Sequence, residues 1–221
     1  MKKPAIILII LLGALLCLSA GLAAFLSLRY ADPGPKVVFL SPSTQGANIY
    51  ADGVTTERDN MNALADLVEA RLLSRGFIVY RNDPEKTYAE AVEDSNALSP
   101  SIHVALHTNA IDGENTGVRG CEAYIRGGSY PCLKLATCLY TAVSAVTPTD
   151  DRGVKYTATL YEATSTSSPS VLLEVDFHDI AEGAEFLTEN RDKIADAVAD
   201  GIVAYFESPV DLPLLLRAFV R

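Results

Sequence analysis

Basic residues are scarce in this sequence. The 221 residues include 18 Lys and Arg against 28 Asp and Glu, which gives a formal net charge of -10 at pH 7. Proteins that bind nucleic acids and other polyanions rely on clusters of Lys and Arg, and the sequence contains no such cluster. The composition therefore excludes nucleic acid as a partner.

Cysteine is also rare, with four residues in the whole chain. Three of them, Cys121, Cys132 and Cys138, lie outside the N-terminal apolar run, and their spacing matches no zinc knuckle. We expect buried thiols, with a Cys121–Cys132 disulfide as the alternative in an extracellular setting. The cysteines thus predict no metal site of their own.

Long apolar runs are confined to the N-terminus. Residues 4–28 are almost uninterruptedly apolar and follow Lys2 and Lys3. A helix of that length can cross roughly 30 Å of hydrocarbon, whereas the apolar region of a cleaved signal peptide is about 7 to 15 residues long. Residues 1–29 therefore predict a signal anchor with the domain on the outer side. A cleaved signal peptide is the alternative.

The rest of the chain reads as one domain. Residues 30–35 form a short linker rich in Pro and Gly, residues 36–207 form the domain, and residues 208–221 form an apolar tail too short to span a membrane. Apolar runs predict strands at 36–41, 77–81, 102–107, 120–126 and 170–177. An extended segment is predicted at 153–163, and helical spacing predicts helices at 57–76, 87–98, 132–146 and 190–206.

This alternation of strands and helices indicates the fold class. Several strands are apolar nearly throughout, which is typical of a sheet that helices cover on both faces. We therefore predict an α/β fold: a single domain with a central, mostly parallel sheet flanked by helices. An N-terminal membrane-spanning or signal segment precedes it.

Polar side chains stand where these elements begin or end. His107 ends a strand, Glu174 interrupts an apolar strand near its end, and Glu57 opens a helix whose dipole favours an ionised carboxylate. Sites in such sheets gather at the carboxyl ends of strands. His and Glu are zinc ligands, and a second glutamate near the metal can act as general base. A structural role for His107 is the alternative, whereas a buried Glu174 requires a partner, a metal or a function.

Five short segments carry a resemblance to a known family. They are Glu57 in TTERDNMNALADLVEARL, ALHTNA (105–110), GCEAY (120–124), RGVK (152–155) and PSVLLEVDF (169–177). In this order they resemble the zinc-dependent N-acetylmuramoyl-L-alanine amidases, peptidoglycan hydrolases with a single α/β catalytic domain, over about residues 36–206. The resemblance implies Glu57 and His107 as zinc ligands, Glu174 as the catalytic residue and Asn109 as a substrate-binding residue.

The sequence departs from the family at its first turn, where the family has a zinc-ligand histidine. LSPSTQ stands there, with Thr44 or Gln45 at the position of the ligand. Catalytic zinc sites usually have three protein ligands, so the third candidate is His178 or Gln45. The alternative is a catalytically silent amidase-like module that binds peptidoglycan or a partner protein and regulates wall enzymes. His103 shares a strand face with His107 and is expected to be a hydrogen-bonded core residue or a residue that supports the site from behind the ligands.

The resemblance also implies where the protein acts. It implies Zn²⁺ as the cofactor and peptidoglycan as the substrate. With residues 4–28 as a membrane anchor, the domain would lie on the bacterial cell membrane facing the wall. The protein would be secreted if the N-terminal segment is cleaved.

Overall fold

The computed structural model describes residues 34–111, 117–148 and 152–207. All the described helices and strands belong to the unit that runs from Lys36 to Arg221. The membrane anchor expected at residues 4–28 and the apolar tail at 208–221 lie outside the described residues. Within the described ranges, none of the helices has the length and hydropathy that crossing a bilayer requires.

Six strands form one sheet in the order β2-β1-β3-β6-β4-β5. The strands are β1 (Val37–Pro42), β2 (Ile78–Arg81), β3 (Ile102–Asn109), β4 (Glu122–Arg126), β5 (Val154–Thr157) and β6 (Ser170–Phe177). Neighbouring strands pair in parallel except β4 and β6, which are antiparallel. The predicted single α/β domain is therefore confirmed, with a mixed sheet. Three strands from the N-terminal half meet three from the C-terminal half where β3 pairs with β6.

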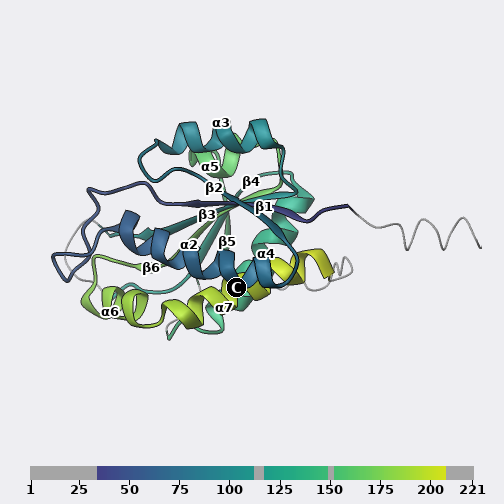
Figure 1. Cartoon of the computed structure of the whole chain (residues 1–221). Coiled ribbons are helices and arrows are strands. Elements are labelled where there is room, and N and C mark those ends of the chain that lie inside the picture. Colours follow the sequence, from purple (N-terminus) through teal and green to yellow (C-terminus); the bar gives the residue numbers. More distant parts are fainter. Residues whose placement is uncertain (1–33, 112–116, 149–151, 208–221) are drawn as a thin grey trace, which may run out of the picture. The chain divides into compact units, whose positions relative to one another are not determined.

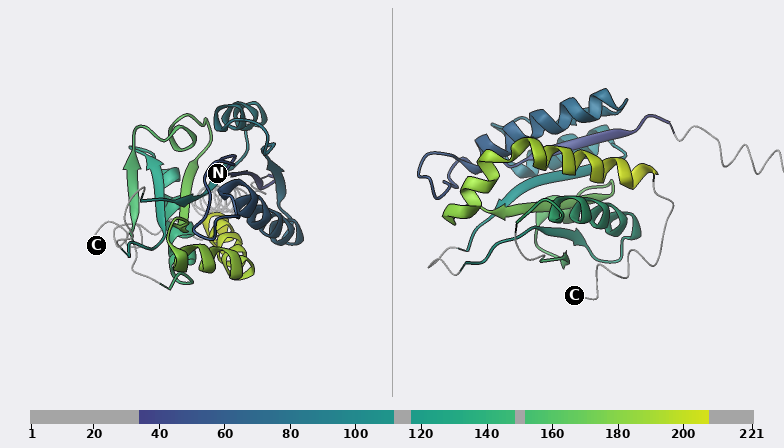
Figure 2. Two further views of the ribbon diagram at one scale, coloured as in Figure 1. Left: turned by 90° about the vertical axis from the view of Figure 1, so that its left-hand side faces the viewer. Right: turned by 90° about the horizontal axis from the view of Figure 1, so that it is seen from below.

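Helices cover both faces of the sheet (Figures 1 and 2). One face is covered by α2 (Glu57–Ser74), α4 (Tyr130–Ser144) and α7 (Arg191–Glu207). The opposite face is covered by α3 (Tyr88–Leu98) and the short helix α5 (Tyr161–Thr164). A further helix, α6 (Ala181–Glu189), connects β6 to α7.

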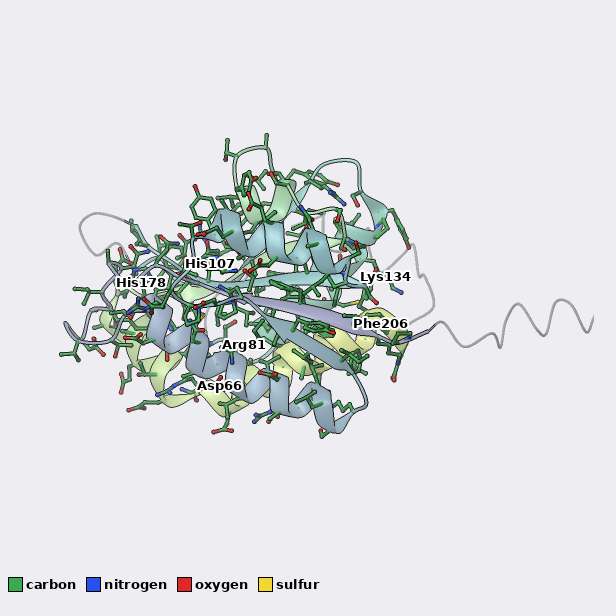
Figure 3. The ribbon with its side chains drawn as sticks, turned by 45° about the horizontal axis from the view of Figure 1, so that its top comes forward. Asp66, Arg81, His107, Lys134, His178 and Phe206 are labelled. Carbon is green, nitrogen blue, oxygen red and sulfur yellow. The ribbon has the colours of Figure 1, made fainter. Side chains whose placement is uncertain are left out.

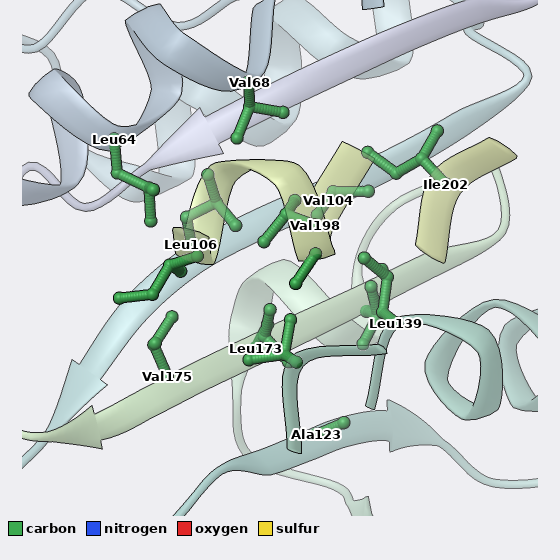
Figure 4. Close-up of a cluster of buried hydrophobic side chains, with 14 of the residues drawn as sticks. Leu64, Val68, Val104, Leu106, Ala123, Leu139, Leu173, Val175, Val198 and Ile202 are labelled. Carbon is green, nitrogen blue, oxygen red and sulfur yellow. The ribbon is translucent and has the colours of Figure 1, made fainter. Parts of the chain in front are cut away.

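The larger hydrophobic core lies between the sheet and helices α2, α4 and α7 (Figure 4). Leu106 of β3 and Leu173 of β6 are fully buried there against helix residues such as Leu64. Burying one such side chain contributes about 1.5–3 kcal/mol. Gly201 allows α7 to approach α4 closely, because a Cβ at this position would lie 2.8 Å from Cα of Leu139.

The face beneath α3 and α5 has a much smaller apolar cluster, which consists of Ala105, Ala163 and Leu172 with Tyr124 and Leu160 packed against it. Because side chains alternate between the two faces of a strand, the residues two positions from Ala105 and Leu172 also point to this face. These residues are polar at the carboxyl ends of β3 and β6. The small core therefore leads directly into a polar site.

Two segments differ from the sequence-based prediction. The sequence predicts an extended segment at 153–163, but β5 ends at Thr157 and α5 begins at Tyr161. Thr157 Oγ1 accepts hydrogen bonds from the backbone N–H groups of the next turn, which ends the strand. Helix α6 is an addition to the predicted elements. Within the described ranges no disulfide joins the cysteines; Cys121 and Cys132 are buried thiols, as expected, whereas Cys138 is only partly buried.

Candidate active site

Glu57 and His107 lie next to each other at the carboxyl end of β3 (His107 is labelled in Figure 3). Glu57 is the first residue of α2, where Thr56 caps the helix by accepting a hydrogen bond from the backbone N–H of Asp59. The partial positive charge of this helix end favours an ionised carboxylate. Oε1 of Glu57 lies 2.9 Å from Nδ1 of His107, and both side chains are buried. The fold therefore brings together two of the residues that the sequence singles out.

Side-chain amides surround Glu57 and His107. Asn48 Nδ2 donates to Oε2 of Glu57 over 2.7 Å and to the side-chain oxygen of Gln45 over 2.9 Å. The amide nitrogen of Gln45 lies 3.5 Å from Nδ1 of His107. Burial opposes ionisation of Glu57, but hydrogen bonds, led by that of His107, lower the pKa of Glu57 below its ordinary value. Glu57 is therefore an ionised carboxylate that points at the imidazole.

A glutamate that the sequence does not single out lies on the other side of His107. Oε2 of Glu162 lies 2.9 Å from Nε2 of His107, and Oε1 accepts a 2.6 Å hydrogen bond from Ser41 Oγ. Burial opposes ionisation of Glu162, but the charge and hydrogen bond of His107 hold the pKa of Glu162 well below its usual range. Glu162 lies on α5, whose four residues are too few to show a helical period in the sequence.

His107 thus has a carboxylate at each ring nitrogen. A neutral imidazole carries one N–H, so one of its nitrogens would then direct a lone pair at a carboxylate oxygen. Burial lowers the pKa of His107, but Glu162 and Glu57 outweigh burial and raise it well above 6.5. A neutral ring can therefore satisfy only one of the two short contacts, and the other requires a cation, which is either a second proton on the ring or a metal ion.

Glu174 is the next polar residue across the sheet. It lies on β6 in register with His107 on β3 and with Glu122 on β4, so the three side chains share one face. Glu174 is partly buried, and among the described residues no group donates a hydrogen bond to its Oε2. Burial and the nearby carboxylates raise the pKa of Glu174 from 4.5 to about 7, although the charge of His107 opposes this change.

Glu122, in contrast to Glu174, is well paired. It accepts hydrogen bonds from Tyr124 and Arg152, and Nζ of Lys155 lies 2.9 Å from its Oε1. Burial opposes its ionisation, but these contacts lower the pKa of Glu122. Asn109 Nδ2 also lies 3.4 Å from Glu122 Oε2. The GCEAY and RGVK segments, which are distant in sequence, therefore meet in one ion cluster beside Glu174.

The two remaining histidines have partners of their own. Nδ1 of His103 lies 2.9 Å from Ser95 Oγ and its Nε2 lies 3.9 Å from Oε1 of Glu162, so His103 is a buried, hydrogen-bonded residue behind the site, as expected from the sequence. Nδ1 of His178 lies 3.0 Å from Oγ1 of Thr108, and its ring stacks on Tyr50 with centroids 5.1 Å apart. Figure 3 shows His178 at the same end of the domain as His107. The contacts of His178 hold it to Thr108 and Tyr50 and do not direct it at Glu57.

The donors near His107 can be compared with those that zinc requires. Within the described ranges, no three side chains of the types His, Cys, Asp and Glu are grouped so as to hold a metal ion. Two such donors, Glu57 Oε1 and His107 Nδ1, do converge. A half-turn of the Gln45 amide would exchange its nitrogen and oxygen and turn an oxygen toward Nδ1 of His107, at the cost of the hydrogen bond that this oxygen accepts from Asn48. With that oxygen, the site would offer zinc two strong ligands and one weak ligand.

Comparison with protein families gives one match over most of the chain. A family model described as N-acetylmuramoyl-L-alanine amidase matches residues 33–204. That range contains every residue of the site described above. The match favours a hydrolase over the catalytically silent alternative. A comparison with curated proteins finds no match.

Several solved structures have a similar fold. AmiC2, an N-acetylmuramoyl-L-alanine amidase of Nostoc punctiforme, is 22% identical with a TM-score of 0.71 over 80% of this chain and 100% of that chain. The catalytic domain of CwlV, also an N-acetylmuramoyl-L-alanine amidase, comes from Bacillus (Paenibacillus) polymyxa var. colistinus. It is 22% identical, with a TM-score of 0.70 over 79% of this chain and 99% of that chain. At these identities the similarity concerns the fold.

Proposed function

The chain belongs to the N-acetylmuramoyl-L-alanine amidase family, and from that premise we propose that Glu57, His107 and Glu174 form the active site of a zinc-dependent peptidoglycan amidase. The protein is a hydrolase of the amide between N-acetylmuramic acid and L-alanine of peptidoglycan. One observation carries the assignment of the site. Glu57 and His107 converge at 2.9 Å, and Glu174, whose Oε2 has no donor within the described ranges, lies in register with His107 on the adjoining strand.

Zinc would be held by Glu57 Oε1 and His107 Nδ1, with the amide oxygen of Gln45 as the third donor. The carboxylates at both ring nitrogens of His107 support this proposal, because a neutral ring can donate to only one of them and a cation is needed at the other. A bound zinc ion polarises a carbonyl group and makes a water molecule acidic enough to attack at neutral pH. His178 is not assigned to the metal, since its Nδ1 already contacts Thr108.

Glu174 is the proposed general base. It accepts a proton from the attacking water and later delivers that proton to the amide nitrogen of the departing L-alanine. A carboxyl group with a pKa of about 7 suits both transfers near neutral pH, because the group can gain and lose a proton with little driving force either way. The neighbouring Glu122 is unsuited to this task, since Lys155 and Arg152 hold it ionised.

Asn109 is proposed to contact the substrate. It is the last residue of β3, two positions after His107, and its side chain is partly buried. Its amide nitrogen makes a long hydrogen bond of 3.4 Å to Glu122, which is weak and easily exchanged. The Asn109 side chain can therefore turn toward the amide or carbonyl groups of a stem peptide.

We further propose that the protein acts at the bacterial membrane, facing the wall. The apolar run at residues 4–28 and the lysines before it support an anchor with the domain outside. Secretion after cleavage is the alternative. N-terminal sequencing of the mature protein distinguishes them, because a new N-terminus at residues 21–25 indicates cleavage.

The activity is tested on purified peptidoglycan with zinc-loaded protein. We expect new α-amino groups of L-alanine and glycan strands whose lactyl groups are free, both identified by mass spectrometry. Glu174→Gln is the matched control and should release roughly 10²- to 10⁴-fold less product per unit time. If the wild type contains stoichiometric zinc and releases no alanine amino groups, the proposed chemistry is wrong.

A further inference from the structure

We propose that Glu162 is a positioning residue, which fixes the ring of His107 so that Nδ1 faces Glu57 and can hold a cation there. The proposal rests on the metal site described above. It concerns a residue that belongs to none of the five family-like segments of the sequence. Its basis is the set of contacts that Glu162 makes, which reach two strands of the sheet.

Both carboxylate oxygens of Glu162 are occupied. Oε2 lies 2.9 Å from Nε2 of His107, whereas Oε1 accepts a 2.6 Å hydrogen bond from Ser41 on β1 and lies 3.9 Å from Nε2 of His103. A carboxylate with partners at both oxygens cannot rotate without losing one of them. Oε2 is therefore fixed in front of His107.

The helix that carries Glu162 is also fixed in place. Ser170 Oγ of β6 donates to the backbone carbonyl of Ala163, and Ala163 packs in the small apolar cluster under α5. The backbone N–H of Leu160, just before the helix, donates to Thr157 Oγ1. These contacts anchor α5 to β5 and β6 independently of the histidines.

A carboxylate in this place carries a large desolvation penalty. Glu162 is 5% exposed, and the adjacent Ala163 packs in the small apolar cluster. A glutamine or a leucine would fill the same space at a lower penalty. The presence of a carboxylate therefore indicates that the negative charge of Glu162 is needed by a neighbouring group. The closest group that can carry a positive charge is His107.

The effect on His107 follows from hydrogen-bonding chemistry. A carboxylate at Nε2 accepts an N–H from that nitrogen and so keeps a proton there. With the proton held at Nε2, the lone pair of a neutral ring lies on Nδ1, which faces Glu57. Carboxylates that accept the second N–H of a metal-binding histidine fix its tautomer and ring orientation and increase its basicity. Glu162 has the position that this role requires.

The test follows the Nε2–H group of His107 directly by NMR of the full-length protein labelled with ¹⁵N at histidine. In the wild type we expect a downfield, slowly exchanging Nε2–H resonance. Glu162→Leu should abolish that resonance or let it exchange with water, and Glu162→Gln should retain it at a less downfield position, because the amide oxygen still accepts. Zinc affinity, measured by chelator competition, should fall roughly 10- to 100-fold in Glu162→Leu.

Matched controls separate positioning from general loss of structure. Thr164→Ala changes the same helix without touching a histidine, since the Thr164 hydroxyl bonds to backbone carbonyls within that turn, and it should leave both measurements unchanged. If Glu162→Leu does not fold, the proposal is tested by comparing the two measurements in Glu162→Gln with those in Thr164→Ala. An Nε2–H resonance identical in wild type and Glu162→Gln, or lost equally in Thr164→Ala, overturns the proposal. Because neither measurement uses turnover, an inactive wild type would count against the proposed function only.

Discussion

Glu174→Gln should make the protein more stable while making it nearly inactive. The carboxyl group of Glu174 is partly buried, its Oε2 has no hydrogen-bond donor among the described residues, and its pKa is raised from 4.5 to about 7. A raised carboxyl pKa means that the fold binds the proton more tightly than the unfolded chain does. The charged form therefore opposes folding once the pH exceeds the unfolded value.

The size of this effect follows from the raised pKa. A tenfold change in proton affinity corresponds to about 1.36 kcal/mol, so the ionised carboxylate destabilises the fold by at most about 3 kcal/mol. The penalty is absent below about pH 4.5, grows as the pH rises, and is complete above about pH 7. Glutamine is neutral at every pH and removes the penalty. For a domain of this size, about 3 kcal/mol corresponds to a rise in Tm of about 6 to 12 °C.

The assay is thermal and urea unfolding of metal-free wild type and Glu174→Gln at pH 5 and pH 8. We expect similar stability at pH 5 and a more stable variant at pH 8. Glu122→Gln is the matched control, because its carboxylate lies in register with Glu174 and is held ionised by Lys155 and Arg152. That variant should be less stable than the wild type at pH 8. If Glu174→Gln is destabilised to the same extent at both pH values, the carboxylate is not strained and the reasoning is wrong.

Four further variants test the site and the fold. His107→Ala should remove bound zinc and destabilise the protein by about 3–5 kcal/mol, since it leaves two buried carboxylates without their cation; metal analysis and urea unfolding measure this. Gln45→Ala should weaken zinc binding, whereas His178→Ala should lower Tm and leave zinc affinity unchanged; the opposite result would make His178 the third ligand. Gly201→Ala should destabilise the fold by about 1–3 kcal/mol, measured by urea unfolding, because the methyl group meets Leu139 of α4; an unchanged midpoint would show that α7 can move aside.

The sequence predicts the fold class because each long helix or strand has a regular pattern of apolar residues along its whole length. The buried residues of α2 recur at helical spacing, and β3 and β6 are almost continuously apolar, so their type and burial follow from pattern alone. The antiparallel direction of β4 does not follow. Its five residues have no feature that distinguishes the two directions, and pairing with β6 is decided by contacts distant in sequence.

The site is only partly predictable, because part of it depends on contacts between residues that are distant in sequence. Glu57 and His107 stand at boundaries between elements, and Glu174 stands out as a charge within an apolar strand, so the sequence marks all three. Glu162 has neither signal. Its helix has a single turn, and the residue pattern around it is that of an extended segment. Only the packing of α5 under the sheet brings Glu162 to His107.

The meeting of the two halves of the sheet at β3 and β6 has a consequence for how the protein acquires activity during folding. His107 is on the last strand of the N-terminal half, whereas Glu162 and Glu174 follow in the C-terminal half. Either half could pair its own strands and still lack a functional site. Contacts of long sequence separation form late because closing the intervening chain is entropically unfavourable. Enzymatic activity should therefore report the final docking step, and a nascent chain that has emerged only as far as β5 is inactive toward the wall.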